Sequence, residues 1–144
     1  MYGKEEASKL RQQFWISFGK YMKPIPSADG LPVNWVNYKT GVKQLFFKME
    51  ATQKEAIISI VIAHADKETR LRYFEQFKAF KSMFSVMLGE DWVWEEEVYN
   101  EHGIPFSRIY KSIDQVNLFD QTHWPSLITF LKPRMVLLDQ FWSD

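Results

Sequence analysis

Apolar residues in the first part of the chain recur every three or four positions, which is the period of a helix with one buried side. The series runs through Ala7, Leu10, Phe14, Phe18 and Met22. Charged residues occupy other positions of the helical wheel, so the pattern predicts an amphipathic helix over residues 5–22. The segment KPIPSADGLP that follows contains three prolines and a glycine and is predicted to be a loop.

Two strands are predicted further along the chain. Residues 42–50 alternate apolar and polar side chains, whereas residues 55–63 are β-branched and almost continuously apolar, as in a strand covered on both faces. The four-residue link ATQK predicts an antiparallel hairpin. The preceding segment NWVNYKTG fits neither period well, and both a short strand and a single helical turn are compatible with it.

A helix is predicted from Asp66 to Leu88. Asp66 can cap its N-terminus, and Gly89 can end it in a left-handed conformation. An apolar stripe runs between these two signals through Leu71, Phe74, Phe77, Phe84 and Leu88.

A second hairpin is predicted over residues 91–99 and 105–113, which are aromatic and β-branched and are separated by NEHGI. Regular alternation would place Glu95 and Glu97 on one face of its first strand and Glu96 on the other face, with Trp92, Trp94 and Val98.

The last apolar segment has helical periodicity. Pro125 suits the first turn of this helix, whereas Pro133 must kink the helix or divide it in two. Its periodic positions are Leu127, Phe130, Leu131, Val136, Leu138 and Phe141.

The order of these elements is α-β-β-α-β-β-α, which predicts an α+β fold. We expect a mainly antiparallel sheet of four to five strands packed against about three helices. A chain of 144 residues has the usual size of one domain, so residues 1–144 are expected to form a single domain.

Composition indicates the compartment. The chain has no cysteine, which excludes disulfides, thiolate nucleophiles and Cys-ligated zinc and is typical of a reducing environment. It also has no run of about 18 apolar residues, and charges interrupt the region where a signal peptide must be apolar. We therefore expect a cytoplasmic protein without a membrane partner.

The formal net charge is zero, but the two halves of the chain differ. Residues 1–72 contain 12 Lys and Arg against 7 Asp and Glu, and residues 73–144 contain 6 against 11. Basic residues of the first half that could follow a phosphate backbone are Lys20, Lys23, Lys39, Lys43 and Lys48. This asymmetry makes nucleic-acid binding a hypothesis to test.

The motifs of common enzyme classes are missing. The six glycines are scattered singly, which excludes a phosphate loop and a dinucleotide fingerprint, and no Gly-x-Ser-x-Gly elbow occurs. His64, His102 and His123 do not have the spacing of a helical zinc pair. We therefore expect no catalytic residue and no cofactor, and we favour a protein without enzymatic activity.

Glu95 and Glu97 are weak candidates for a metal site. On one side of a strand their side chains would stand about 6–7 Å apart and could hold a divalent cation loosely. We prefer the interpretation that they form an acidic, solvated strand face that discourages edge pairing, and we predict no metal site.

Several segments resemble one bacterial family, known only as a domain of unknown function, DUF4268. They are RQQFWISFGKYM, NWVNYKTGVKQLFFKM, FEQF, LGEDWVWE and the closing helix. In larger members the domain follows a nuclease-like region of the PD-(D/E)XK type, which implies a role beside DNA processing or phage defence. We expect a stand-alone member, because nothing precedes the first predicted helix. No Asp or Glu is followed two positions later by Lys, as that nuclease chemistry requires.

Two functional hypotheses follow. The first is a non-enzymatic, self-associating binding module that uses NWVNYKTG and its neighbourhood as a contact surface. The candidate contact residues are Asn34, Trp35, Asn37, Tyr38, Lys39 and Lys43. The competing interpretation is that Trp35 and Tyr38 fill the core. The second hypothesis is a nucleic-acid-processing or phage-defence-associated protein, either nuclease-like in fold or accessory to a nuclease.

Overall fold

The computed structural model describes residues 3–143, and the predicted α+β class is confirmed. The elements are α1 (Lys4–Met22), β1 (Leu45–Ala51), β2 (Glu55–Ile62), α2 (Lys67–Ala79), α3 (Lys81–Leu88), β3 (Val93–Tyr99), β4 (Pro105–Asp114), the short 3-10 helix η1 (Gln121–His123) and α4 (Trp124–Ser143). The strands form one antiparallel sheet in the order β1-β2-β4-β3. No helix among the described residues is long and apolar enough to cross a membrane.

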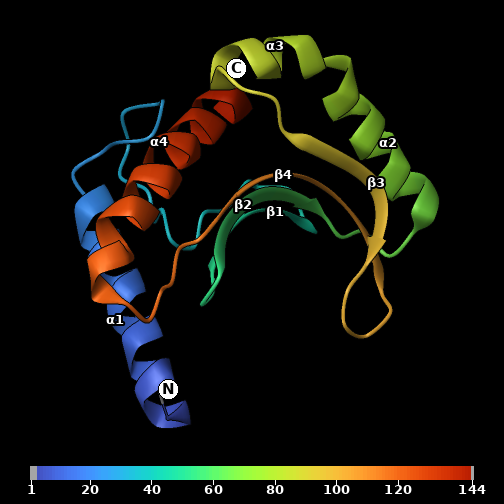
Figure 1. The fold of residues 1–144 in the computed structure, drawn as a ribbon. Helices are drawn as coiled ribbons and strands as arrows, with labels where there is room; N and C mark the ends of the chain where they lie inside the picture. Colours follow the sequence, from blue (N-terminus) through green and yellow to red (C-terminus); the bar gives the residue numbers. More distant parts are fainter. Residues whose placement is uncertain (1–2, 144) are drawn as a thin grey trace.

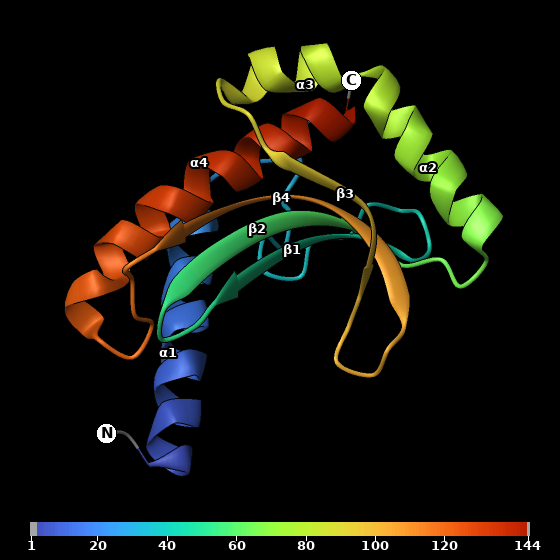
Figure 2. The same cartoon turned by 45° about the vertical axis from the view of Figure 1, so that its right-hand side comes forward.

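The sheet is arched, and its helical layer lies on the convex side (Figures 1 and 2). There α4 contacts β1 and β2, α2 contacts β2 and β4, and α3 packs on α4. The first helix, α1, packs beside α4. Both views show no helix beneath the middle of the arch, so the concave face of the sheet is open.

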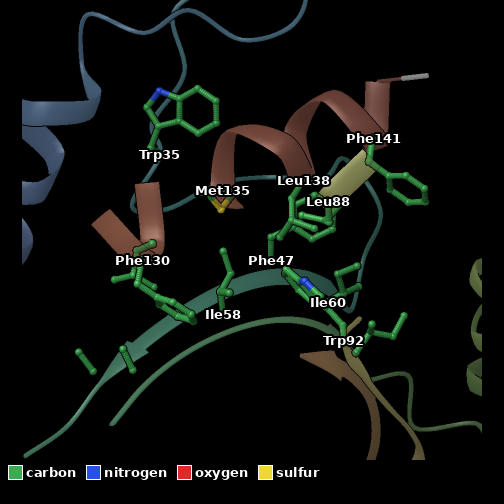
Figure 3. Close-up of a cluster of buried hydrophobic side chains, with 14 of the residues drawn as sticks. Trp35, Phe47, Ile58, Ile60, Leu88, Trp92, Phe130, Met135, Leu138 and Phe141 are labelled. Atoms are coloured by element: carbon green, nitrogen blue, oxygen red, sulfur yellow. The ribbon is translucent and has the colours of Figure 1, made fainter. Parts of the chain in front are cut away.

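The core fills the space between the sheet and α4. Ile58 and Ile60 of β2 are completely buried, and Figure 3 shows Met135 and Leu138 of α4 directed toward them. Phe84 of α3 extends this core by edge-to-face contacts with other aromatic rings, namely Trp92, Trp94 and Phe141. The high aromatic content therefore supplies core volume at the junction of α3, α4 and β3.

The strand β2 is buried on both faces, but by different means. Its convex-face residues lie under α4 and α2. On the concave face Ser59 and Val61 are buried without a second layer, because β2 is a central strand with β1 on one side and β4 on the other. The prediction that β2 is buried on both faces is therefore correct at these positions. However, no layer of helices covers the concave face, as a strand of this kind would usually have.

The helix predicted from Asp66 to Leu88 is interrupted. Asp66 caps it as predicted, since its carboxylate accepts from the Thr69 N–H at 2.9 Å, and Gly89 ends it with φ of 71°. However, the chain leaves helical geometry at Phe80, where φ is −104° and ψ is 15°. The break separates two packing directions, since α2 lies against the sheet and α3 against α4. One straight helix could not follow both surfaces.

Pro133 does not divide the last helix, because α4 continues from Trp124 to Ser143. Proline removes the N–H that would bond to the carbonyl four residues earlier, here that of Thr129. Both residues are exposed on the outer side of the helix, where water can bond to that carbonyl. Of the two predicted alternatives, division is therefore wrong.

The long segment between α1 and β1 has no regular element and is attached to α4 by Asp139. The buried Asp139 carboxylate accepts from the Tyr38 hydroxyl at 2.5 Å and from the Ala28 N–H at 2.8 Å. Near the end of the helix, the Trp142 indole donates to the Thr40 carbonyl at 2.9 Å. These contacts hold the segment against the helical layer.

Replacing Asp139 should destabilise the protein strongly. In Asp139→Ala the Tyr38 hydroxyl and the Ala28 N–H lose their acceptor, and we expect the free energy of unfolding to fall by about 3 kcal/mol. Urea unfolding measures this change. Gln140→Ala, at the adjacent exposed position of α4, should stay within about 0.5 kcal/mol of wild type. Equal stability of the two variants would contradict the anchoring role.

The same contact predicts a pH dependence. Burial and the hydrogen bond to Asp139 raise the pKa of Tyr38 above its ordinary value of 10.0. The folded state therefore retains the phenol proton that the unfolded state releases, so this contribution to stability is complete below pH 10 and is lost as the pH rises further. Between pH 9 and 12, wild-type stability should fall more steeply than that of Tyr38→Phe. Parallel curves would contradict the prediction.

Candidate binding site on the concave face of the sheet

The strand register identifies the side chains of the concave face. One row of paired residues crosses all four strands. It consists of Lys48 in β1, Ser59 in β2, Tyr110 in β4 and Val93 in β3. Because side chains alternate along each strand, every second residue joins this row on the open face. The other members are Phe46, Glu50, Ile57, Val61, Glu95, Phe106, Arg108 and Ser112.

A hollow of about 360 Å³ lies on this face, at the end where the β3–β4 hairpin extends beyond the sheet. Ser59, Val61 and Arg108 lie on strands at its floor and sides. The loop of the hairpin adds Glu101 and Ile104. Other lining residues are Lys48, Glu50, Ala63, Asn100, Pro105 and Phe106. Six of these eleven lining residues are polar or charged and five are apolar, so the hollow offers both kinds of contact to a ligand.

Arg108 lines the hollow and is held by two neighbouring side chains. Its Nε donates to Glu95 Oε1 at 2.5 Å, and its guanidinium carbon lies 4.1 Å from the centroid of the Tyr110 ring. Among the described residues neither Nη1 nor Nη2 has a partner. Two contacts thus fix the orientation of the guanidinium and leave two nitrogens available to a ligand.

Two further polar groups of the hollow lack partners within the described part of the chain. The Ser59 side chain is only 3% exposed, yet its hydroxyl forms no hydrogen bond there. The Lys48 ammonium lies 5.3 Å from the Phe46 ring centroid and has no carboxylate partner. Neither group is bonded within the described structure, so both can bond to water or to a ligand in the hollow.

A buried arginine holds the β3–β4 hairpin, whose loop forms one side of the hollow. Arg70 of α2 is 1% exposed and donates to the His64 carbonyl at 2.9 Å and to Glu97 Oε1 at 3.1 Å. The Tyr99 hydroxyl donates to the other Glu97 oxygen at 3.0 Å, which lowers the pKa of Glu97. This cluster ties the end of β3 to α2.

The expectation that Glu95 and Glu97 share one strand face is wrong. A β-bulge interrupts the β3–β4 pairing between Glu95 and Val98. Glu95 therefore binds Arg108 on the concave face, whereas Glu97 binds Arg70 of α2. A bulge changes the side to which the following residues point. The two carboxylates bind different arginines, and the loose cation site considered from the sequence is not formed in this structure.

The NWVNYKTG segment lies away from this hollow. Trp35 is buried, donates from its indole to the Ile25 carbonyl at 2.9 Å and stacks near Tyr38, so both aromatic rings contribute to the core. The polar candidates are exposed, namely Asn34, Asn37, Lys39 and Lys43. A second hollow of about 300 Å³ brings Asn34 together with Lys20 and Lys23 at the end of α1. Binding by these polar residues stays a prediction.

None of the three histidines lines the hollow. His64 stacks on Tyr73 with ring centroids 4.6 Å apart, and His123 accepts from the Asn117 N–H through Nδ1 at 2.9 Å. His102 is exposed in the loop of the hairpin. Within residues 3–143 no three His, Asp or Glu side chains lie close enough to share a metal ion.

Sequence reasoning missed Arg108 and Ser59. The signal that could have found them is the alternation Phe106, Arg108, Tyr110, which places an arginine between two aromatic residues on one strand face. Recognising this as an open face also requires knowing that the helices lie on the other side. That knowledge comes from tertiary structure.

Comparison with known proteins identifies the family only. The family model described as domain of unknown function (DUF4268) matches residues 10–144, which is nearly the whole chain. No curated protein and no solved structure matches this chain.

We expect the protein to tolerate removal of the Ser59 hydroxyl, because this hydroxyl forms no hydrogen bond within the described structure. We expect Ser59→Ala to change the free energy of unfolding by less than about 0.5 kcal/mol, because no hydrogen bond is lost. Val61→Ala, at the neighbouring buried position of the same face, should cost about 2 kcal/mol through lost packing. Urea unfolding of both variants provides the comparison. A loss above about 1 kcal/mol in Ser59→Ala would show that the hydroxyl has a structural partner.

Proposed function

The chain belongs to the DUF4268 family of domains of unknown function, and we propose that it is a binding module without enzymatic activity. Its concave hollow binds an extended peptide segment that has one carboxylate between apolar side chains. The observation that supports this proposal most directly is the orientation of Arg108, which Glu95 and Tyr110 hold in place.

Recognition of a carboxylate follows from the geometry of arginine. A guanidinium presents its N–H groups in a planar fork that matches two carboxylate oxygens. Because Glu95 and the Tyr110 ring already order Arg108, binding costs less side-chain entropy than it would with a free arginine. The Ser59 hydroxyl at the floor of the hollow offers one further hydrogen bond to the same ligand.

The apolar walls favour neighbouring aliphatic or aromatic side chains. Val61, Ile104 and Phe106 line the same hollow as Arg108. Ile104 is more than half exposed, so a ligand that covers it removes apolar surface from water. An extended peptide supplies side chains to such a surface without a folded interface of its own.

Charge favours a peptide over nucleic acid. Glu50 and Glu101 line the hollow, and Glu95 partly neutralises Arg108. A phosphate backbone with one charge per nucleotide would meet these carboxylates, whereas a single peptide carboxylate can bind Arg108 alone. The lysines of the first half do not extend a basic surface into the hollow, since only Lys48 of that group lines it.

Selection from a library of random displayed peptides tests the proposal. Enriched sequences should share one Asp or Glu flanked by apolar residues, and their synthetic, fluorescein-labelled forms should bind in anisotropy titrations. Arg108→Gln should weaken binding by about tenfold or more, because the charged hydrogen bonds are lost. Changing the peptide carboxylate to an amide should have an effect of similar size.

Arg72→Gln is a matched control, because Arg72 is an exposed arginine of α2 on the other side of the sheet. It should bind selected peptides as wild type does. The absence of enriched peptides, or equal binding by Arg108→Gln, would overturn the proposal. Salt-sensitive binding of an oligothymidylate that Arg108→Gln abolishes would replace the peptide with single-stranded nucleic acid.

A further inference from the structure

The outer edge of β1 has backbone groups with no partner in the described structure. In an antiparallel pair, opposite residues alternate between those that exchange two hydrogen bonds and those that exchange none. The Ala63 N–H donates to the Gln44 carbonyl, and the Thr52 N–H donates to the Glu55 carbonyl, both at 2.8 Å. Even-numbered residues of β1 therefore bond to β2, and odd-numbered residues point their N–H and C=O groups outward.

The loop before β1 satisfies only the first of these outward residues. The Leu45 N–H donates to the Val42 carbonyl at 3.3 Å, and the Leu45 carbonyl accepts from the Thr40 hydroxyl at 2.9 Å. No residue of the described chain bonds to the outward groups of Phe47, Met49 and Ala51. Three consecutive outward pairs of donor and acceptor are thus unpaired along this edge of the described sheet.

We propose that a second copy of this chain occupies the edge, with the two β1 strands antiparallel about a two-fold axis at Met49. In this register Met49 is opposite its counterpart and Phe47 is opposite the partner's Ala51, so six backbone hydrogen bonds form. Lys48 is then directly opposite Glu50 of the partner subunit, twice by symmetry. These residues form a pair without backbone bonds, in which side chains approach most closely.

Charge selects this register over its neighbours. Moving the axis by one residue toward the start of β1 places Lys48 opposite the partner's Lys48, and moving it the other way places Glu50 opposite the partner's Glu50. Both alternatives bring like charges together and are unfavourable. The pairing also supplies a carboxylate to Lys48, which has none among the described residues of its own chain.

The other edge of the sheet is less suited to pairing. Its strand β3 has a bulge between Glu95 and Val98 and three consecutive glutamates. Bulges and charges are the devices by which edge strands avoid association. In β1 the described pairing is regular from Leu45 to Ala51, so a dimer through β1 would continue the sheet to eight strands with both concave faces on one side.

Sedimentation velocity of the full chain from micromolar to millimolar concentration tests the dimer. Wild type should dimerise, and Lys48→Glu and Glu50→Lys should each weaken the dimer by about tenfold or more, since each places two like-charged pairs across the axis. The double variant with both changes restores opposite charges and should dimerise nearly as well as wild type. A wild-type protein that stays monomeric would overturn the proposal.

Two controls separate charge pairing in this register from general charge effects and from peptide binding. Lys54→Glu reverses a charge in the exposed turn after β1, outside the pair, and should dimerise as wild type does. Arg108→Gln should also dimerise normally, because Arg108 lies on β4 and takes no part in the pairing at the β1 edge. If single and double charge variants behave alike, the register is wrong.

Discussion

One constraint organises this structure: a four-stranded sheet with helices on only one of its faces. The helices α2, α3 and α4 all lie on the convex side, and α4 lies over β2, where Ile58 and Ile60 are completely buried. Asp139 extends the same layer by attaching the loop after α1 to α4. The concave face has no such cover, so its own side chains must shield the central strands. That requirement explains why lysine and arginine stems, aromatic rings and a buried serine occur together there.

The open face brings fold and proposed function together. Tyr110 and Glu95 order Arg108, while Arg70 holds the bulged strand whose hairpin walls the hollow. The packing that fixes β3 on the convex side thus also places the polar groups on the concave side. At the β1 edge, Lys48 and Glu50 belong to the open face, and in the proposed dimer they also select the strand register.

Local sequence signals predicted the elements well. The period of the apolar residues located α1 and both hairpins, and the Asp66 cap and Gly89 marked the ends of the second helical region. What could not be predicted depends on contacts between distant segments. Phe80 interrupts a helix because its two halves pack on different surfaces, and the bulge after Glu95 redirects Glu97 toward Arg70. Arg108 became a site residue only once the position of the helical layer was known, because alternation alone does not say which face is open.

The central claim is that the concave face is solvent-exposed in the free protein, and paramagnetic relaxation of methyl groups by a neutral, soluble gadolinium chelate tests it most directly. At low concentration, where a dimer dissociates, the half-buried methyls of Ile57 and the exposed methyls of Val93 should relax strongly. Those of Ile58 and Ile60, under α4, should not. Protection of Ile57 and Val93 equal to that of Ile58 and Ile60 would contradict the account, because it would mean that a second layer covers the concave face.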